Sequence, residues 1–397
     1  MKAIHHPGYE GFLRTEQAWR ELSGAARSVR FFNAYEWYAA FFAHLLPPDE
    51  PIGVIELQCA GRCVGLFPYH QRRIRRGGLD LTVLCLPASP HLVLADALLA
   101  DTFEARAALN AIRKCLAQEG LTWHALLLPA VREDSHGMRL GLALGRRAIM
   151  RSAGGSRFFD ATQPYGTLTG QFAGPLRKNL RKGMKRLEQT GAVEFLSVRG
   201  ADARMPWAFE RFLALEASGW KGEAGAGSAI ALRESVTSFY RVLAQADGAE
   251  LRAEINLLCL DGTPIAGQFA TVCRSHRSIH KIAYDESFRH ASPGTLLMAH
   301  AVQLSCEDET IHSLSLVTDM PWMEDWKASR AAVYEVWIAK SALFAFLARA
   351  VLHIRELRTA PRRPSSAPPK GSSEGPSRRD RADDEHANQA AAEVICE

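Results

Sequence analysis

The chain has 397 residues, of which 47% are hydrophobic and 23% charged, and a formal net charge of +5. This profile is typical of a globular protein with room for two hydrophobic cores, at roughly 100 to 200 residues per domain, and it excludes disorder throughout. The charge excess is too small to indicate a nucleic-acid-binding protein by itself.

The first half of the sequence alternates between helical and strand patterns. Apolar residues recur at helical spacing in some segments, and short apolar runs bounded by turn residues occur in others. The expected elements are a helix over residues 33–44, strands over 52–59, 64–70 and 79–86, a helix over 102–119, a strand over 122–128 and a helical stretch from residue 133.

The second half repeats this order without obvious sequence identity. We expect a strand over 193–198, helices over 206–218 and 231–246, a meander of strands over 251–260, 265–273 and 278–285, a helix from Ser292 to about residue 306, a strand over 311–317, a short helix over 322–329, a strand over 333–338 and a final helix. In that middle helix Ser292 is the expected N-cap and Pro293 the first helical residue.

Two similar units in tandem explain this repetition. We predict an α/β (α+β) fold with mixed, mainly antiparallel sheets flanked by helices, divided into residues 1–160 and 161–358. Residues 359–397 are rich in Pro, Ser, Gly and mixed charge, so we predict a disordered tail.

Cysteine usage and apolar runs bear on the compartment. The eight cysteines are scattered without zinc-ligand spacing, so we expect a reduced intracellular protein and no metal site. The N-terminus shows no apolar signal-peptide core, and no uncharged run reaches the roughly 20 residues of a spanning helix. We therefore expect a cytoplasmic location, with contact at the periphery of the inner membrane left open.

Five stretches of the second half, taken in order, carry a family resemblance. They are GPLRKNLRKGMKRLEQTG, FLALEASGWKGEAGAGSAI, LDGTPIAGQF, KIAYDESFRHASPGTLL and DMPWMEDWK. Through them residues 172–326 resemble the FemAB-like branch of the GNAT acyltransferases, which includes the CelD-type proteins of cellulose biosynthesis. The resemblance implies tandem GNAT-like domains, the first of them degenerate, and an acyl-CoA as co-substrate without a covalent cofactor. In the last matching stretch Trp326-Lys327 stands where the family often carries Tyr-Lys.

The start of the helix at Ser292 is the candidate donor site. Backbone N–H groups and the helix dipole favour an anion there, such as the pyrophosphate of CoA, and Gly294 permits close approach. The candidate residues are Arg289, Ser292, Gly294 and Thr295. The alternative is an ordinary capped helix.

Three residues at the end of the preceding strand are candidates for catalysis. Direct attack of an acceptor on a thioester needs a base, a donor for the thioester oxygen and an acid for the leaving thiolate. Asp285 is the candidate base and Tyr284 the candidate acid, with Lys281 beside them. Alternatively, Tyr284 is a strand residue with a solvated hydroxyl and Asp285 forms a turn.

Candidate acceptor residues lie in two segments. A Trp between glycines on a flexible loop suits a lid or a binding platform, although a helix-ending Gly with a Trp folded onto the core is the alternative. The candidates are Glu216, Trp220, Lys221, Asp319, Trp326 and Lys327.

One predicted helix carries six cations opposite an apolar stripe. They are Arg177, Lys178, Arg181, Lys182, Lys185 and Arg186. Such a face can hold CoA phosphates, an anionic acceptor, tRNA or an anionic lipid leaflet, and a solvated helix face is the alternative. A second cluster, Arg72, Arg73, Arg75 and Arg76, is expected to widen the same surface. Duplex DNA is disfavoured because no helix-turn-helix or zinc-finger spacing accompanies them.

These observations together predict an acyltransferase. The expected reaction moves an acyl group, acetyl in the first instance, from acyl-CoA to an amine or hydroxyl of a small molecule or glycan, such as a polysaccharide or cell-envelope precursor. Two alternatives remain. One is a FemAB-like transferase that uses aminoacyl-tRNA, and the other is a non-catalytic GNAT-like module of a polysaccharide-synthesis complex.

Overall fold

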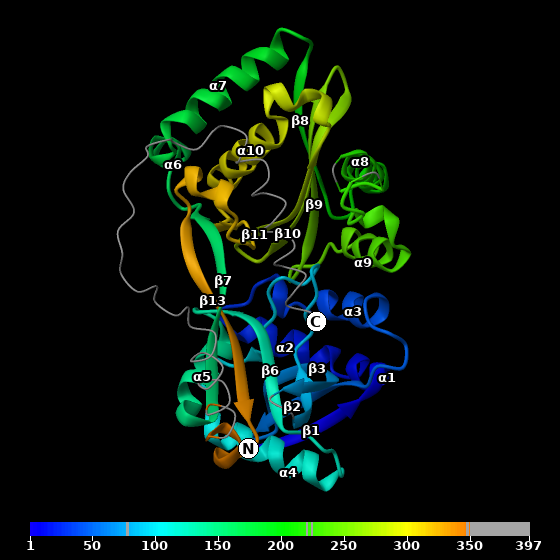
Figure 1. The fold of residues 1–397 in the computed structure, drawn as a ribbon, viewed down its shortest axis with the longest axis vertical. Helices are drawn as coiled ribbons and strands as arrows, with labels where there is room; N and C mark the ends of the chain where they lie inside the picture. Colours follow the sequence, from blue (N-terminus) through cyan, green and yellow to red (C-terminus); the bar gives the residue numbers. More distant parts are fainter. Residues whose placement is uncertain (77–78, 220, 224, 347–348, 350–397) are drawn as a thin grey trace, which may run out of the picture.

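Two lobes stacked along the long axis of the molecule make up the protein (Figure 1). The computed structural model describes residues 1–76, 79–219, 221–223, 225–346 and 349. The predicted tail over 359–397, and all but the start of the predicted final helix, lie outside the described residues.

The N-terminal lobe contains every element that the sequence predicted for the first half, together with several that it did not. The missed helices and strands are β1, α1, α2, β5 and β7, the last because its Gly-Gly pair resembles a linker, and the short 3-10 helices η1 and η2 were missed as well. In chain order the elements are β1 (Lys2–Pro7), α1 (Gly8–Leu13), α2 (Glu16–Ala25), η1 (Phe31–Asn33), α3 (Tyr35–His44), β2 (Ile52–Cys59), β3 (Arg62–Arg76), β4 (Leu79–Cys85), β5 (Leu98–Leu99), α4 (Ala105–Gln118), β6 (Ala125–Arg132), α5 (His136–Leu144), η2 (Gly145–Arg147) and β7 (Ala148–Asp160).

The C-terminal lobe follows the predicted order closely. The expected strand over 311–317 is shorter, because the chain leaves the sheet at Val317, whose φ is 62°. The short helix after it is of the 3-10 type. The elements are α6 (Tyr165–Gln171), α7 (Gly174–Glu188), β8 (Val193–Arg199), α8 (Met205–Ser218), η3 (Ile230–Leu232), α9 (Glu234–Ala244), β9 (Arg252–Leu260), β10 (Thr263–Cys273), β11 (His276–Tyr284), η4 (Glu286–Ala291), α10 (Pro293–Glu307), β12 (Ser313–Ser315), η5 (Pro321–Trp326) and β13 (Ser329–Ala339).

One sheet runs through both lobes, in the order β1-β2-β3-β4-β6-β13-β7-β12-β11-β10-β9-β8. Each half gives its last long strand to the other, since β13 pairs with β6 and β7 pairs with β12. Two pairings, β4 with β6 and β11 with β12, are parallel, and the other pairs in this path are antiparallel. This arrangement confirms the predicted fold class, whereas the division at residue 160 stays a prediction.

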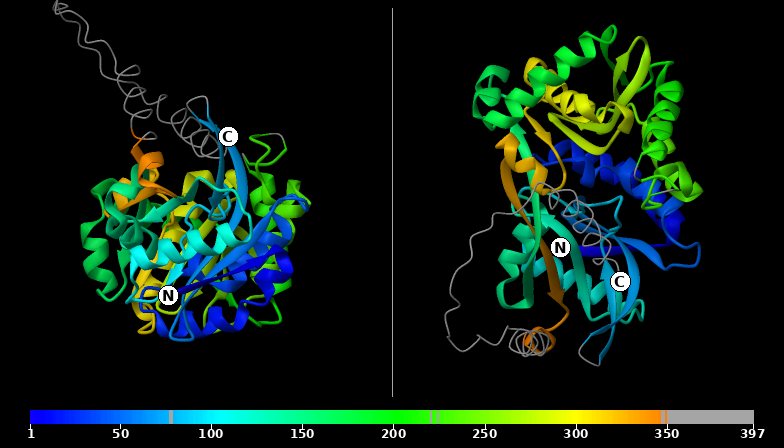
Figure 2. Two further views of the ribbon diagram at one scale, coloured as in Figure 1. Left: turned by 90° about the horizontal axis from the view of Figure 1, so that it is seen from below. Right: turned by 45° about the horizontal axis from the view of Figure 1, so that its top comes forward.

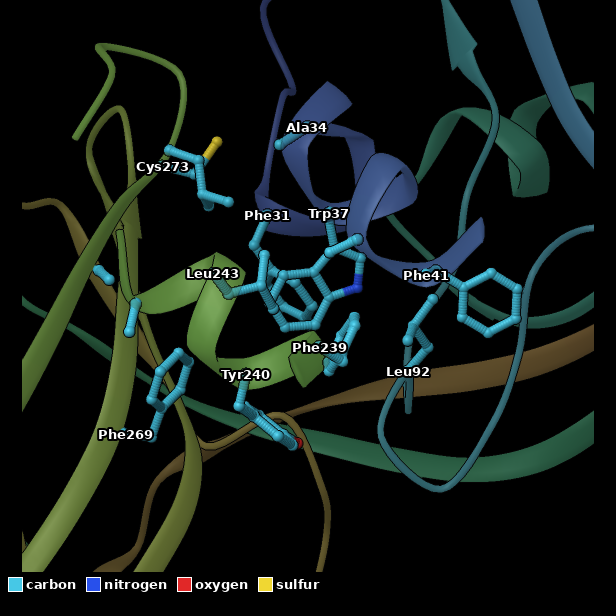
Figure 3. Close-up of a cluster of buried hydrophobic side chains, with 14 of the residues drawn as sticks. Phe31, Ala34, Trp37, Phe41, Leu92, Phe239, Tyr240, Leu243, Phe269 and Cys273 are labelled. Atoms are coloured by element: carbon cyan, nitrogen blue, oxygen red, sulfur yellow. The ribbon is translucent and has the colours of Figure 1, made fainter. Parts of the chain in front are cut away.

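An aromatic cluster joins the lobes (Figure 3). Trp37 of α3 lies edge-on to Phe239 of α9, with ring centroids 5.6 Å apart, and Tyr240 lies 5.1 Å from Phe269 of β10. All four side chains are fully buried. Burial of each large apolar side chain stabilises by about 1.5–3 kcal/mol, so this cluster holds α3 of one lobe firmly against the other.

Candidate active site

Strand β11 is paired with β12 only at its beginning. The parallel ladder joins residues 276–278 to 313–315, whereas β10 accompanies β11 as far as Tyr284. In the described part of the chain, residues 279–284 therefore have no strand on their second side. An extended ligand can add along such an edge through main-chain hydrogen bonds.

The corresponding strand of the N-terminal lobe differs. Residues 83–85, the last of β4, form the parallel ladder with residues 125–127 of β6, so the part of β4 that has no second neighbour among the described residues, 79–82, comes before the ladder. An open stretch that follows the parallel ladder is therefore found in the C-terminal lobe.

A bulge in β11 sets which side chains face α8. Phe269 pairs with Lys281 and Ala270 with Ile279, so His280 is the extra residue. A bulge re-aims the side chains that follow it. Ala283, two residues after Lys281, belongs to the core beneath α8, whereas Ile282 and Tyr284 pack toward α10 and α7.

An ion pair at the end of α8 fastens the following loop to the edge of β11. Nζ of Lys221 lies 3.1 Å from Oε1 of the buried Glu216 and donates to the Ile282 carbonyl at 3.2 Å. Oε2 of Glu216 accepts from the Ile230 N–H at 2.9 Å. The predicted pair Glu216 and Lys221 is thus brought to the open edge.

A pocket of about 260 Å³, open to solvent, lies at this edge. Helix α8, its following loop and the end of β11 form its walls. The lining residues are Leu215, Glu216, Gly219, Lys221, Ile282, Ala283, Tyr284 and Glu286.

Lys281 is the most perturbed cation of the site. Burial, and then the nearby positive charge of Lys221, lower the pKa of Lys281 to about 8, and Glu216 opposes this effect. A group that titrates near neutral pH can both accept and release a proton under working conditions.

The N-terminal lobe contributes His91 to the same cluster, a residue that the sequence did not single out. Its Nδ1 lies 3.5 Å from the Tyr240 hydroxyl, and the two rings meet edge-on at 5.7 Å. Burial and the charges of Lys281, Arg233 and Lys221 lower the pKa of His91 to about 3. His91 is therefore neutral at physiological pH, and no local sequence pattern connects it to residues some 150 positions away.

The three predicted catalytic residues separate into two groups. The Asp285 carboxylate accepts from the N–H and the hydroxyl of Ser287, at 2.9 and 2.7 Å, so it caps η4 as a turn former. Asp285 does not line the pocket. Tyr284 does line it. Lys281 is not among the lining residues, but it is near enough to Lys221 and Glu216 for their charges to act on it.

The predicted donor residues lie together around the start of α10. Ser292 occupies the N-cap position with φ of 54°, but its side chain makes no cap. Instead Asn179 of α7 donates to the Ser292 hydroxyl at 3.1 Å. A Cβ built on Gly294 would lie 3.2 Å from Cδ1 of Tyr284, so this glycine packs α10 against β11. Arg289 is exposed in η4 and Thr295 lies in the first turn of α10.

The predicted acceptor residues do not form one site. Asp319 pairs with Arg157 at 2.5 Å and with Arg330. Trp326 is buried against the Phe172 ring at 5.1 Å, in the core beneath α6 and α7. Figure 1 shows α6 and α7 across the sheet from α8.

The other two predicted acceptor residues are Lys327 and Trp220. Lys327 is exposed and ends η5 with φ of 53°. Trp220 lies outside the described residues. Among the described members of the predicted acceptor set, Glu216 and Lys221 line the pocket.

The expected joining of the two basic clusters is wrong. Arg72, Arg73, Arg75 and Arg76 belong to β3 in the N-terminal lobe, whereas α7 lies at the far end of the C-terminal lobe (Figure 2). The two basic clusters lie apart because β3 belongs to the N-terminal lobe and α7 to the C-terminal lobe.

Among the described residues, no group of three or more His, Cys, Asp or Glu side chains is placed to hold a metal ion. No helix in that part of the chain has the length and apolarity that crossing a membrane requires.

Comparison with family models finds a match in the second half of the chain. Residues 175–328 match the family described as an acetyltransferase (GNAT) domain. No curated protein matches the sequence significantly.

Solved structures with the same fold cover both lobes. FemX superposes with a TM-score of 0.53 at 10% identity, over 84% of this chain and 97% of that one. The C-terminal (DUF2156) domain of an Agrobacterium fabrum protein described as a lysylphosphatidylglycerol synthetase gives 0.50 at 12% identity, over 87% and 96%. A tandem GNAT protein of clavulanic acid biosynthesis gives 0.45 at 12%, over 85% and 98%. At these identities the first two likenesses concern the fold alone.

Proposed function

We propose that the protein transfers an acyl group from an acyl-CoA to an amine or hydroxyl at the open edge of β11. The observation that carries this proposal is the divergence of β11 and β12 beside the start of α10. The pantetheine arm of CoA is an extended chain with two amides, which suits an edge that offers main-chain donors and acceptors. The first turn of α10 suits its pyrophosphate.

Lys281 and Tyr284 take the proton-transfer roles in this proposal. The acceptor nitrogen or oxygen attacks the thioester carbonyl carbon while Nζ of Lys281, in its neutral form, takes the acceptor proton. The carbon–sulfur bond breaks, and the Tyr284 hydroxyl gives its proton to the departing sulfur. Lys281 replaces Asp285 as base because its pKa of about 8 is near working pH and Asp285 is engaged in capping.

The pocket limits how the acceptor binds. Small-molecule sites typically enclose about 300–1,000 Å³, whereas this pocket is a small hollow whose volume is largely open to solvent. We infer that it admits the reacting end of the acceptor while the remainder stays outside. An acetyl donor and a sugar, polysaccharide or cell-envelope precursor as acceptor fit this description.

Calorimetric titration with acetyl-CoA, and with CoA for comparison, tests the donor. Thr295→Glu places a negative charge in the first turn of α10, where the helix dipole stabilises it but a phosphate is repelled. Thr295→Gln is the matched control of equal size. Binding by the wild type and the Gln variant, with loss in the Glu variant, supports the proposal. Equal binding by all three refutes the assigned donor site.

Transfer assays on two further variants test the base. Lys281→Gln should lower kcat by about a hundredfold or more, the usual contribution of general acid–base catalysis. Asp285→Asn keeps an oxygen that accepts from Ser287, so kcat should stay within about threefold. The reverse result would restore Asp285 as the base.

A second candidate function uses aminoacyl-tRNA as the donor. The cationic face of α7 favours it, because six exposed cations can contact phosphates. Binding of tRNA that weakens steeply with salt, together with no binding of acetyl-CoA, would favour this donor. Acetyl-CoA binding without turnover on any acceptor would instead favour the non-catalytic module.

A further inference from the structure

Helix α7 presents a continuous cationic face to solvent. Leu176, Gly183 and Leu187 are its buried residues, and the helix of 15 residues is about 22 Å long. The six cations occupy the opposite half of its circumference, and all are exposed. They are Arg177, Lys178, Arg181, Lys182, Lys185 and Arg186.

These charges have few acidic neighbours: the exposed Glu324 and Asp325 of η5 lie near the start of α7 but form no ion pair with its cations among the described residues. Solvated helix faces commonly pair opposite charges four residues apart, as Arg20 and Glu16 do on α2 at 2.7 Å. Glu188 at the end of α7 is its only acidic residue. Within the described residues none of the six cations takes part in an ion pair. The face therefore has a strong field of one sign.

An exposed tryptophan lies next to the beginning of this helix. The Ala173 N–H, just before α7, donates to the Asp325 carbonyl of η5 at 2.8 Å. Trp322 of η5 remains 38% exposed. A tryptophan beside a row of cations is the composition of segments that lie at a lipid–water interface.

The position of α7 favours a flat partner. Figures 1 and 2 show it at one end of the long axis, where none of the described helices and strands lies beyond it. A folded nucleic acid is contacted over a broad basic area, but the other basic cluster lies in the opposite lobe. A flat bilayer, in contrast, can contact a single surface helix along its whole length.

We propose that α7 and Trp322 dock the protein on an anionic lipid bilayer. This proposal is independent of the donor and of the catalytic residues, and it adds a location to the activity. Docking would hold the C-terminal lobe at the membrane surface by electrostatic attraction with a small interfacial anchor.

Sedimentation with vesicles tests it on the full chain. The vesicles contain phosphatidylcholine alone or with 30% phosphatidylglycerol. The docking variant combines Lys178→Gln, Arg181→Gln, Lys182→Gln and Lys185→Gln. A control with the same charge change combines Arg73→Gln, Arg75→Gln, Arg106→Gln and Lys114→Gln, all exposed in the N-terminal lobe.

The wild type should bind the anionic vesicles and not the neutral ones. Each cation near an anionic surface strengthens binding several-fold. The α7 variant should therefore lose more than a hundredfold in partition coefficient, and the control should stay within about threefold. Trp322→Ser should lower partitioning several-fold at constant charge. All substituted side chains are exposed, and unchanged circular dichroism and melting would show that the fold is kept.

Three outcomes would overturn the proposal. Absence of wild-type binding to anionic vesicles is one. Equal losses in the α7 variant and the control would mean that net charge alone drives binding. Displacement of the protein from vesicles by stoichiometric tRNA, with tRNA binding lost in the α7 variant, would assign the face to nucleic acid.

Discussion

Replacing Lys281 with methionine should stabilise the protein while abolishing transfer. The lysine is partly buried, and its pKa falls from 10.5 to about 8 on folding. At 1.36 kcal/mol per pKa unit, the charged form costs the folded state about 3 kcal/mol. Lys281→Met keeps the length of the side chain and removes this cost, so the free energy of unfolding at pH 7 should rise by up to about 3 kcal/mol.

The stability difference between Lys281→Met and the wild type should depend on pH. Below pH 8 the lysine is charged in both folded and unfolded states, so the wild type bears the full cost. Between pH 8 and 10.5 the folded lysine is neutral while the unfolded one keeps its proton, and the cost disappears. The difference between variant and wild type should therefore be full at pH 7, smaller at pH 9 and nearly absent at pH 10.5. Urea unfolding followed by tryptophan fluorescence measures it.

Lys221→Met is the matched control in the same cluster, with the opposite expected sign. Lys221 is the ion-pair partner of the buried Glu216 at 3.1 Å, and its loss leaves that carboxylate uncompensated. Breaking such a pair costs about 3–5 kcal/mol. The reasoning fails if both substitutions change stability in the same direction, or if the Lys281→Met difference does not depend on pH.

Two further predictions concern packing and the buried charges, each measured by thermal unfolding. Gly183→Ala should lower the free energy of unfolding by about 1–3 kcal/mol, because the new Cβ would lie 2.3 Å from the Ala291 carbonyl oxygen. Gly174→Ala, at the open start of α7, is the control and should change the free energy of unfolding by less than about 1 kcal/mol. Arg277→Met should lower the free energy of unfolding by about 3 kcal/mol or more, because it removes the ion-pair partner that lies 2.8 Å from the fully buried Glu254. Adding Glu254→Gln should restore part of this stability, because it removes the buried charge. A double variant as unstable as Arg277→Met alone would contradict this account.

Local patterns predicted most elements of the fold. The meander of β9, β10 and β11 is set by alternating apolar residues and by a turn at Asp261, which has φ of 48° beside a glycine. Strand β13 was also expected as a strand. Its position between β6 and β7 was not expected, because local sequence patterns do not show which strands pair when they are about 200 residues apart.

The candidate site was predicted in part, for similar reasons. Glu216 and Lys221 are five residues apart at a helix end, so their proximity could be foreseen. Asp319 and Trp326 were predicted as acceptor residues together with Glu216 and Lys221, because a sequence pattern does not show on which side of a sheet a segment lies. His91 reaches the site across the contact between the lobes, where it meets Tyr240 of α9 while Trp37 of α3 packs on Phe239.

The exchange of β7 and β13 bears on how the chain folds as it leaves the ribosome. The N-terminal lobe exposes the edge of β6 until residues 329–339 emerge, about 200 residues later. At 5–20 residues per second this interval is about 10–40 s. An unpaired apolar strand edge invites pairing with other chains, so the nascent protein should depend on chaperones during that time, and ribosome-bound chains that stop before residue 329 should bind them persistently.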